Sequence, residues 1–149
     1  MDETANKYWN EFWKEKEQPQ SVIACQFGFE SDADELAQLI IDGKKTATCS
    51  AYMLYEMENS PLPTINSYNI VLNSKYEPVA IIKITEVQII KMNEVPVEIA
   101  LAEGEGDLSY EYWWNAHKKF FTTELSEYDR EFSEDMLLVV EKFELVDVN

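Results

Sequence analysis

The stretch Asp42-Gly43-Lys44-Lys45-Thr46-Ala47-Thr48-Cys49-Ser50 combines a glycine, two lysines and small hydroxyl residues inside a strongly acidic chain. Gly43 suits the left-handed conformation that ends many helices, and the Thr46-Ala47-Thr48 run favours a strand. The two lysines therefore fall at a corner between a helix and a strand. Two interpretations stay open: their ammonium groups stabilise the negative end of the helix, or they line a site.

The alternation of side chains along the expected strand raises a question about Lys45 and Thr48. We predict a strand from Thr46 to about Tyr55. Successive side chains of a strand point to opposite faces, so Thr48 and Lys45 would point away from each other. The two can share a site only if the backbone turns or bulges at the start of the strand.

Two helices are predicted before the corner. Residues 4–16 carry an aromatic stripe at helical spacing, which is typical of a helix that covers the core; the alternative is a platform for an aromatic ligand. Gln18-Pro19-Gln20 should end this helix, and residues 21–29 should form a strand or an extended connection. Ser31 and Asp34 have the spacing of a capping box, so a second helix should run from there to about Asp42. The stripe of the first helix consists of Tyr8, Trp9, Phe12 and Trp13.

The middle and the end of the chain predict strands. Residues 56–67 contain two prolines among polar residues and should form a surface loop. The apolar runs 68–73 and 78–90, separated by a turn-like segment, predict an antiparallel hairpin whose second strand is long enough to be a bent central strand of a barrel. Residues 136–146 should supply a closing strand. The predicted fold class is therefore α+β, with a β-barrel flanked by helices.

A second unusual stretch is Ala102-Glu103-Gly104-Glu105-Gly106-Asp107, which holds two of the four glycines of the chain. Glycines at this spacing allow positive φ angles, so the carboxylates can be aimed into a cleft; the alternative is a solvated acidic turn. A helix should begin at Asp107 or Ser109. Its apolar stripe carries His117, the only histidine, either as a hydrogen-bonded structural residue or as a catalytic one.

Composition limits the classes of partner. The chain has 149 residues, of which 46% are hydrophobic, so we expect one domain with one core. Its net charge of -17 disfavours long nucleic acid and anionic membranes as partners, but leaves room for a local pocket that binds one nucleoside or nucleotide. We expect a cytoplasmic protein, because the N-terminus has no signal peptide pattern and no apolar run approaches a membrane span. Cys25 and Cys49 should be reduced thiols, and we predict no metal site.

The corner also resembles a known family. Gly43-Lys44-Lys45-Thr46-Ala47-Thr48 matches the Gly-x-Lys-x-x-Thr pattern of the ASCH domain, which is related to the PUA domain of RNA-modifying proteins. Similar segments cover nearly the whole chain, and the Glu-Gly-Glu-Gly-Asp run resembles the larger bacterial ASCH proteins of about this length. The chain departs from this pattern at Trp114, where relatives often have arginine, and at Ile65-Asn66-Ser67, where they have a Val-Gly-Asp turn. The similar segments begin at Phe27, Ala33, Lys45, Pro61, Pro78, Thr85, Ala102 and Tyr112, together with His117.

The resemblance implies a fold and an activity. It implies a single ASCH domain over residues 1–149, in which residues 1–20 are a helical extension and the sheet forms a PUA-like, mixed or antiparallel β-barrel. Short ASCH relatives look like amidohydrolases that remove the acetyl group from N4-acetylcytidine, without a cofactor or a metal. By position, their catalytic residues correspond to Lys45, Thr48 and Glu105, with Glu103 as the alternative carboxylate. Further expected substrate contacts are Lys44, Glu103, Asp107, Trp113 and His117.

Several alternatives remain open at this point. Either Thr48 or water is the nucleophile, and Lys45 either activates Thr48 or polarises the carbonyl of the substrate. Burial would lower the proton affinity of Lys45 and nearby acids would raise it. A different class of function is a non-catalytic ASCH module that binds RNA or a modified nucleotide, and a third is regulation through a protein partner. The sequence does not predict the oligomeric state.

Overall fold

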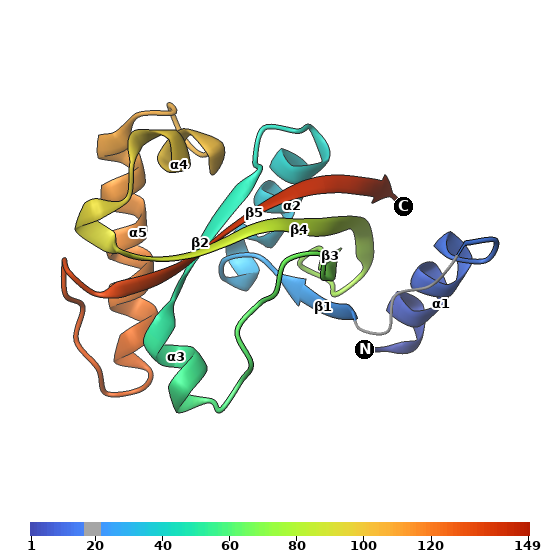
Figure 1. The fold of residues 1–149 in the computed structure, drawn as a ribbon, viewed down its shortest axis with the longest axis horizontal. Coiled ribbons are helices and arrows are strands. Elements are labelled where there is room, and N and C mark those ends of the chain that lie inside the picture. The colour runs from blue at the N-terminus through green and yellow to red at the C-terminus, as the bar shows by residue number, and fades with distance from the viewer. Residues whose placement is uncertain (17–21) are drawn as a thin grey trace.

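A computed structural model describes residues 1–16 and 22–149 of the chain (Figure 1). The helix-breaking segment predicted at Gln18-Pro19-Gln20 lies outside these residues. The elements are α1 (Glu3–Phe12), β1 (Val22–Gln26), the 3-10 turn η1 (Glu30–Asp32), α2 (Ala33–Ile41), β2 (Ala47–Ala51), α3 (Tyr52–Met57), β3 (Tyr68–Leu72), β4 (Pro78–Lys91), the 3-10 turn η2 (Met92–Glu94), α4 (Val97–Ala102), α5 (Tyr110–Ser126) and β5 (Leu137–Val148).

The five strands form one mixed sheet in the order β1-β3-β4-β5-β2, which curls into a half-barrel. Among the strand pairs that the structure describes, β1–β3 alone is parallel. The predicted hairpin is confirmed as β3–β4, and the predicted closing strand is β5, which pairs with both β4 and β2. β4 is long and has two register shifts against β5, as expected of a bent central strand. The α+β class is therefore confirmed.

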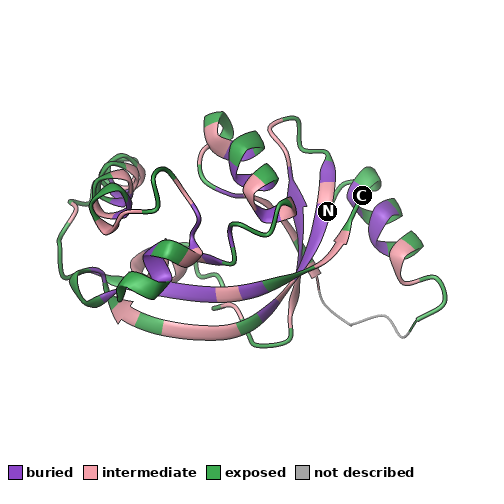
Figure 2. Ribbon diagram, turned by 90° about the horizontal axis from the view of Figure 1, so that it is seen from above, coloured by how far each residue is buried: buried purple, intermediate pink, exposed green. Residues whose placement is uncertain are grey.

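Each helix packs one of its faces against the sheet. Figure 2 shows them buried on the side toward the strands and exposed on the other. The aromatic stripe of α1 packs rather than forming an open platform: Tyr8 and Trp9 are buried against Ile70 of β3 and Ile81 of β4. Tyr8 also donates a hydrogen bond of 2.8 Å to the Asp147 carboxylate of β5. The helix that caps the core is thus confirmed, although it ends at Phe12 rather than near residue 16.

The predicted strand after the corner is wrong in its second half. β2 ends at Ala51, and Tyr52–Met57 form the helix α3. The turn into a helix buries Leu54 in the core beside α5, and it lets the Tyr55 hydroxyl pair with that of Ser50 at 2.9 Å. Tertiary packing here outweighs the local strand preference.

The predicted capping box at Ser31 is also wrong. α2 begins at Ala33 after the turn η1, and Asp32 accepts a hydrogen bond of 3.3 Å from the Phe29 amide. Asp34 does not reach back to the helix start. Its carboxylate instead accepts two hydrogen bonds from Ser74, each 2.8 Å long, so it fastens α2 to the β3–β4 turn.

The cysteines and the helices agree with what composition predicts. Cys25 and Cys49 are both free. Among the described helices, none combines the length and the apolar content that crossing a bilayer requires.

Candidate functional site

The corner between α2 and β2 begins with a tightly hydrogen-bonded helix end. Gly43 has φ 74°, and its N–H donates to the Ile40 carbonyl at 3.0 Å. The Lys44 N–H donates to the Leu39 carbonyl at 2.9 Å, which completes a Schellman motif. β2 then begins only at Ala47. Lys45 therefore lies before the strand, where the regular alternation of side chains does not apply.

The acidic loop lies directly against this corner. Gly104 has φ 70°, and a side chain built on it would come within 2.1 Å of the Lys44 carbonyl oxygen. Close by, the Thr46 N–H donates to the Ala102 carbonyl at 2.7 Å. Glycine is required at position 104 by both the positive φ and the contact with backbone. This contact brings Glu103 and Glu105 next to the lysines.

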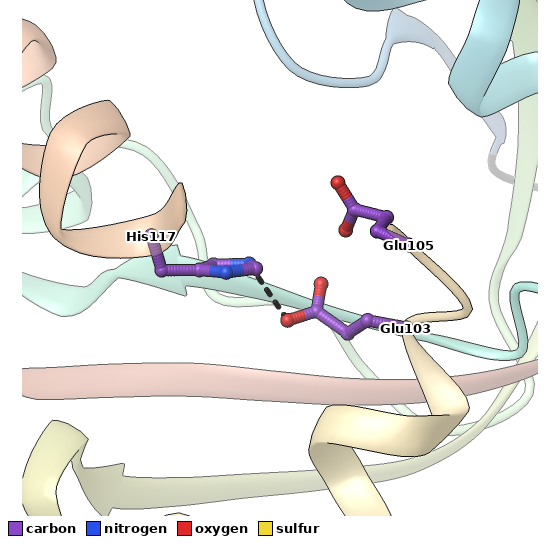
Figure 3. A group of neighbouring side chains, drawn as sticks. All are labelled: Glu103, Glu105 and His117. Atoms are coloured by element: carbon purple, nitrogen blue, oxygen red, sulfur yellow. Dashed lines mark ion pairs between the residues drawn. The ribbon is translucent and has the colours of Figure 1, made fainter. Parts of the chain in front are cut away.

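Buried charges meet where the two segments touch. The Lys45 Nζ lies 3.1 Å from Glu103 Oε1 and 3.3 Å from Glu105 Oε2. The other oxygen of Glu103, Oε2, lies 2.7 Å from His117 Nε2 and also accepts a hydrogen bond from the Trp113 indole. Figure 3 shows Glu103 between His117 and Glu105. The acidic loop thus places two carboxylates at the ammonium, and α5 holds one of them, Glu103, from its other side.

The two central charges hold each other ionised. Burial by itself would lower the pKa of Lys45, but Glu103 and then Glu105 outweigh it, so the pKa of Lys45 is raised. Burial would likewise raise the pKa of Glu103, but Lys45 and His117 outweigh it and lower that pKa. Lys45 is therefore an ammonium at neutral pH. It can polarise a carbonyl but cannot serve as a base.

His117 is held as an imidazolium. Its Nδ1 lies 2.8 Å from the Trp113 carbonyl, so both ring nitrogens face acceptors and both must carry a proton. Burial would lower its pKa, but Glu103 outweighs burial and the pKa is raised. The ring also stacks on Trp113, with centroids 4.6 Å apart. These contacts fit the structural role, in which His117 and Trp113 fix the carboxylate of Glu103.

A cavity of about 390 Å³ opens beside this cluster. Glu103 and Lys45 are almost completely buried, at 1% and 2% exposure, whereas Glu105 is 23% exposed. Glu105 is thus the more accessible of the two carboxylates that contact the lysine. The cavity is lined by Lys45, Thr48, Glu103, Glu105 and His117, and by Phe29, Tyr112 and Phe120.

The structure does not bring every expected contact to the cavity. Lys44 is exposed and does not line it. Asp107 is also exposed, and its carboxylate accepts a 2.9 Å hydrogen bond from the Ser109 amide at the start of α5. Trp113 is buried and contacts Glu103 rather than the cavity. Sequence reasoning missed Phe29 and Phe120, which line the cavity and pack against each other with ring centroids 4.5 Å apart.

The cluster has donor types that suit a metal ion. Ligand atoms of Glu103, Glu105 and His117 lie within 4.8 Å of one another. However, a ligating histidine must offer an unprotonated nitrogen, and His117 has none free. The Lys45 ammonium already contacts both carboxylates and would repel a cation. The donor set therefore does not fit a metal ion.

Comparison with known proteins identifies relatives over nearly the whole chain. Residues 23–147 match the family model described as "ASCH domain". A crystal structure of a protein from Enterococcus faecalis V583 is 38% identical, with a TM-score of 0.89 over 99% of this chain and 91% of that one. An ASCH domain from Lactobacillus crispatus JV V101 is 34% identical, with a TM-score of 0.92 over 100% and 97%. An ASCH protein from Zymomonas mobilis, 14% identical over 85% and 70% with a TM-score of 0.50, shares the fold alone. No curated protein matches the chain.

Proposed function

The chain belongs to the ASCH domain family, and from this premise and the geometry of its cavity we propose that it is an amidohydrolase of small acylated nucleosides such as N4-acetylcytidine. One observation carries the proposal: Lys45 and Thr48 of the corner and Glu105 of the acidic loop, 60 residues after Lys45, line one cavity. Its volume of about 390 Å³ is within the range of small-molecule sites. The net charge of -17 favours a single nucleoside over a long RNA.

Lys45 stabilises the negative charge that develops during hydrolysis. When water adds to an amide, the carbonyl oxygen becomes an oxyanion, and a fixed cation next to it lowers the barrier. The Lys45 ammonium is buried and held by Glu103 at 3.1 Å, so it needs little reorganisation. Glu103 and Glu105 keep Lys45 protonated, so it acts as a cation that polarises the carbonyl of the substrate. Of the two roles open for Lys45 in the sequence, polarisation of the carbonyl is the one that we propose.

Glu105 is the general base in this proposal, and water is the nucleophile. The Glu105 carboxylate takes one proton from the water while the oxygen of that water bonds to the carbonyl carbon of the substrate. It then gives that proton to the amide nitrogen as the C–N bond breaks, releasing a carboxylic acid and the free amine. The Thr48 hydroxyl orients the water or the substrate, since Lys45 is an ammonium held by Glu103 and Glu105 and cannot activate that hydroxyl as a nucleophile.

Glu103 positions the other groups instead of reacting. Its two oxygens already accept from Lys45, His117 and Trp113, which leaves little capacity for a substrate proton. Its lowered pKa also makes it a weak base. The buried carboxylate therefore fixes the lysine, and the more accessible Glu105 carries the proton.

The direct test is incubation of the purified protein with N4-acetylcytidine. We expect cytidine and acetate to appear in equal amounts, measured by chromatography. If the compound binds but is not cleaved, the protein is the non-catalytic binding module instead. If it neither binds nor reacts, the nucleoside class is wrong.

Replacement of Glu105 by glutamine should separate catalysis from stability. We expect kcat to fall by about 10²- to 10⁴-fold, because the proton carrier is lost. The free energy of unfolding should change by less than about 1 kcal/mol, because Glu103 still pairs with the lysine and position 105 is partly exposed. Turnover assays and urea denaturation measure the two effects.

Two matched variants complete this experiment. Glu98→Gln on the exposed face of α4 should leave both quantities unchanged. Glu103→Gln should instead lower the free energy of unfolding by about 3–5 kcal/mol, since it leaves the buried His117 imidazolium without its carboxylate and Lys45 with Glu105 alone. Full turnover by Glu105→Gln would refute the role of Glu105.

A further inference from the structure

A second cavity, of about 520 Å³, adjoins the first. The two share Gly28, Thr48, Cys49 and Phe120 in their walls. Aromatic rings contribute much of the second lining, whereas no lysine, arginine or histidine belongs to it among the described residues. A substrate that reacts beside Thr48 can therefore extend into a flat, apolar space. The rings in this lining are those of Phe27, Tyr55, Tyr68 and Phe120.

Glu141 is the unusual residue of this second cavity. It lies on β5 directly opposite Thr48 of β2, so the two side chains are on the same face of the sheet. Only 8% of Glu141 is exposed, yet it lines the cavity. In the described part of the chain, no hydrogen bond or ion pair satisfies its carboxyl group. Its carboxyl oxygens stay accessible from the cavity, where a bound ligand can pair with them.

The carboxyl of Glu141 is balanced between its two protonation states. Burial raises the pKa of Glu141 to about 7. The titratable groups that face it are Cys25 on β1, Tyr55 on α3 and Glu124 on α5. Burial raises the pKa of Glu124 to about 7 as well, and Glu58 and Glu127 add to the effect. None of these neighbours supplies a positive charge, so an uncharged Glu141 is abundant at neutral pH.

We propose that the second cavity binds the heterocyclic base of the substrate, and that the Glu141 carboxyl pairs with a ring nitrogen and the adjacent N–H of that base. The nucleoside class rests on the function proposed above. An uncharged carboxyl has one O–H donor beside one acceptor, which matches the ring nitrogen and exocyclic N–H of a cytosine-type base. The rings of Phe27 and Phe120 offer apolar surfaces for stacking. Thr48, opposite Glu141, then lies where the base meets the acylated nitrogen.

Calorimetric titration with cytidine, the product, tests this inference without requiring turnover. The wild-type protein should bind cytidine more weakly as the pH rises from about 6 to about 8, because ionised Glu141 loses its donor. Glu141→Gln keeps a donor beside an acceptor but cannot titrate, so its affinity for cytidine should vary less with pH than that of the wild type, with Glu124 as a remaining titrating group of the cavity. Glu141→Leu should bind about tenfold more weakly, since it loses both hydrogen bonds. Glu144→Gln, exposed on the same strand, is the control.

The outcomes separate this inference from the proposed function. Wild-type affinity for cytidine in Glu141→Leu, or an unchanged pH dependence in Glu141→Gln, would overturn the role of Glu141 even if N4-acetylcytidine were hydrolysed. Binding with the expected pH dependence but no hydrolysis would support this inference and reject the amidohydrolase. If Glu141→Leu does not fold, the pH profile of Glu141→Gln decides. Absence of cytidine binding by the wild-type protein overturns this inference, whereas the hydrolysis assay with N4-acetylcytidine decides the proposed function.

Discussion

Replacement of Lys45 by methionine is expected to abolish hydrolysis and to destabilise the fold by about 3–5 kcal/mol. Methionine keeps the length and apolar stem of lysine but leaves the Glu103 carboxylate, at 1% exposure, without its ion pair to Lys45 and with His117 as its remaining cationic partner. It also removes the cation that we propose to stabilise the oxyanion, so kcat should fall by at least about 10²-fold. Urea denaturation measures the stability, and release of cytidine from N4-acetylcytidine measures the activity.

The double variant Lys45→Met/Glu103→Gln distinguishes these two effects. It removes both members of the buried pair, so much of the lost free energy of unfolding should return. Activity should not return, because the ammonium is still missing. If Lys45→Met retained wild-type turnover, the proposed mechanism would be wrong. If the double variant recovered activity, Lys45 would matter only for folding.

Substitution of Gly104 by alanine adds one methyl group, and we expect it to destabilise the protein more than any other change of this size. The added methyl would lie 2.1 Å from the Lys44 carbonyl oxygen and 2.6 Å from its carbon, both of which are backbone atoms. The loop must therefore move away from the corner, which would separate Glu103 and Glu105 from Lys45. We expect a loss of about 3 kcal/mol or more in the free energy of unfolding, together with loss of turnover.

Gly43→Ala is the matched control for this change. Gly43 also has a positive φ, 74°, but nothing lies within 4 Å of the position of an added methyl. Only the backbone strain of the left-handed conformation remains, about 1–2 kcal/mol. Thermal unfolding should rank the variants as wild type, Gly43→Ala and Gly104→Ala. Equal melting temperatures for the two variants would contradict the close contact at Gly104.

Local patterns in the sequence were enough to predict the corner. Gly43 ends α2 in the left-handed conformation, as its position after the helical stripe predicts. The β3–β4 hairpin followed from its two apolar runs and the turn between them. These features depend on neighbours in sequence, so residue types alone carry the information.

Features that depend on distant contacts could not be predicted in the same way. The helix α3 is favoured by the burial of Leu54 against α5, not by its own sequence pattern. The protonation of Lys45 depends on how burial balances two carboxylates about 60 residues away. Pattern and resemblance also left Glu103 and Glu105 as alternatives, which differ only in accessibility and hydrogen bonding. The sequence contains one weak indication that Glu141 belongs to a site: it is a lone acid after two apolar residues, in the run Val139-Val140-Glu141.

The helix α1 has a consequence for where the chain can be shortened. The matched family region starts at residue 23, beyond α1 and its buried aromatic residues. A truncation to that boundary would uncover Ile70, Leu72 and Ile81 in one apolar patch on β3 and β4. Patches of this kind promote aggregation. The helix α1 therefore covers an apolar patch on the inner strands β3 and β4 that would otherwise associate with other molecules.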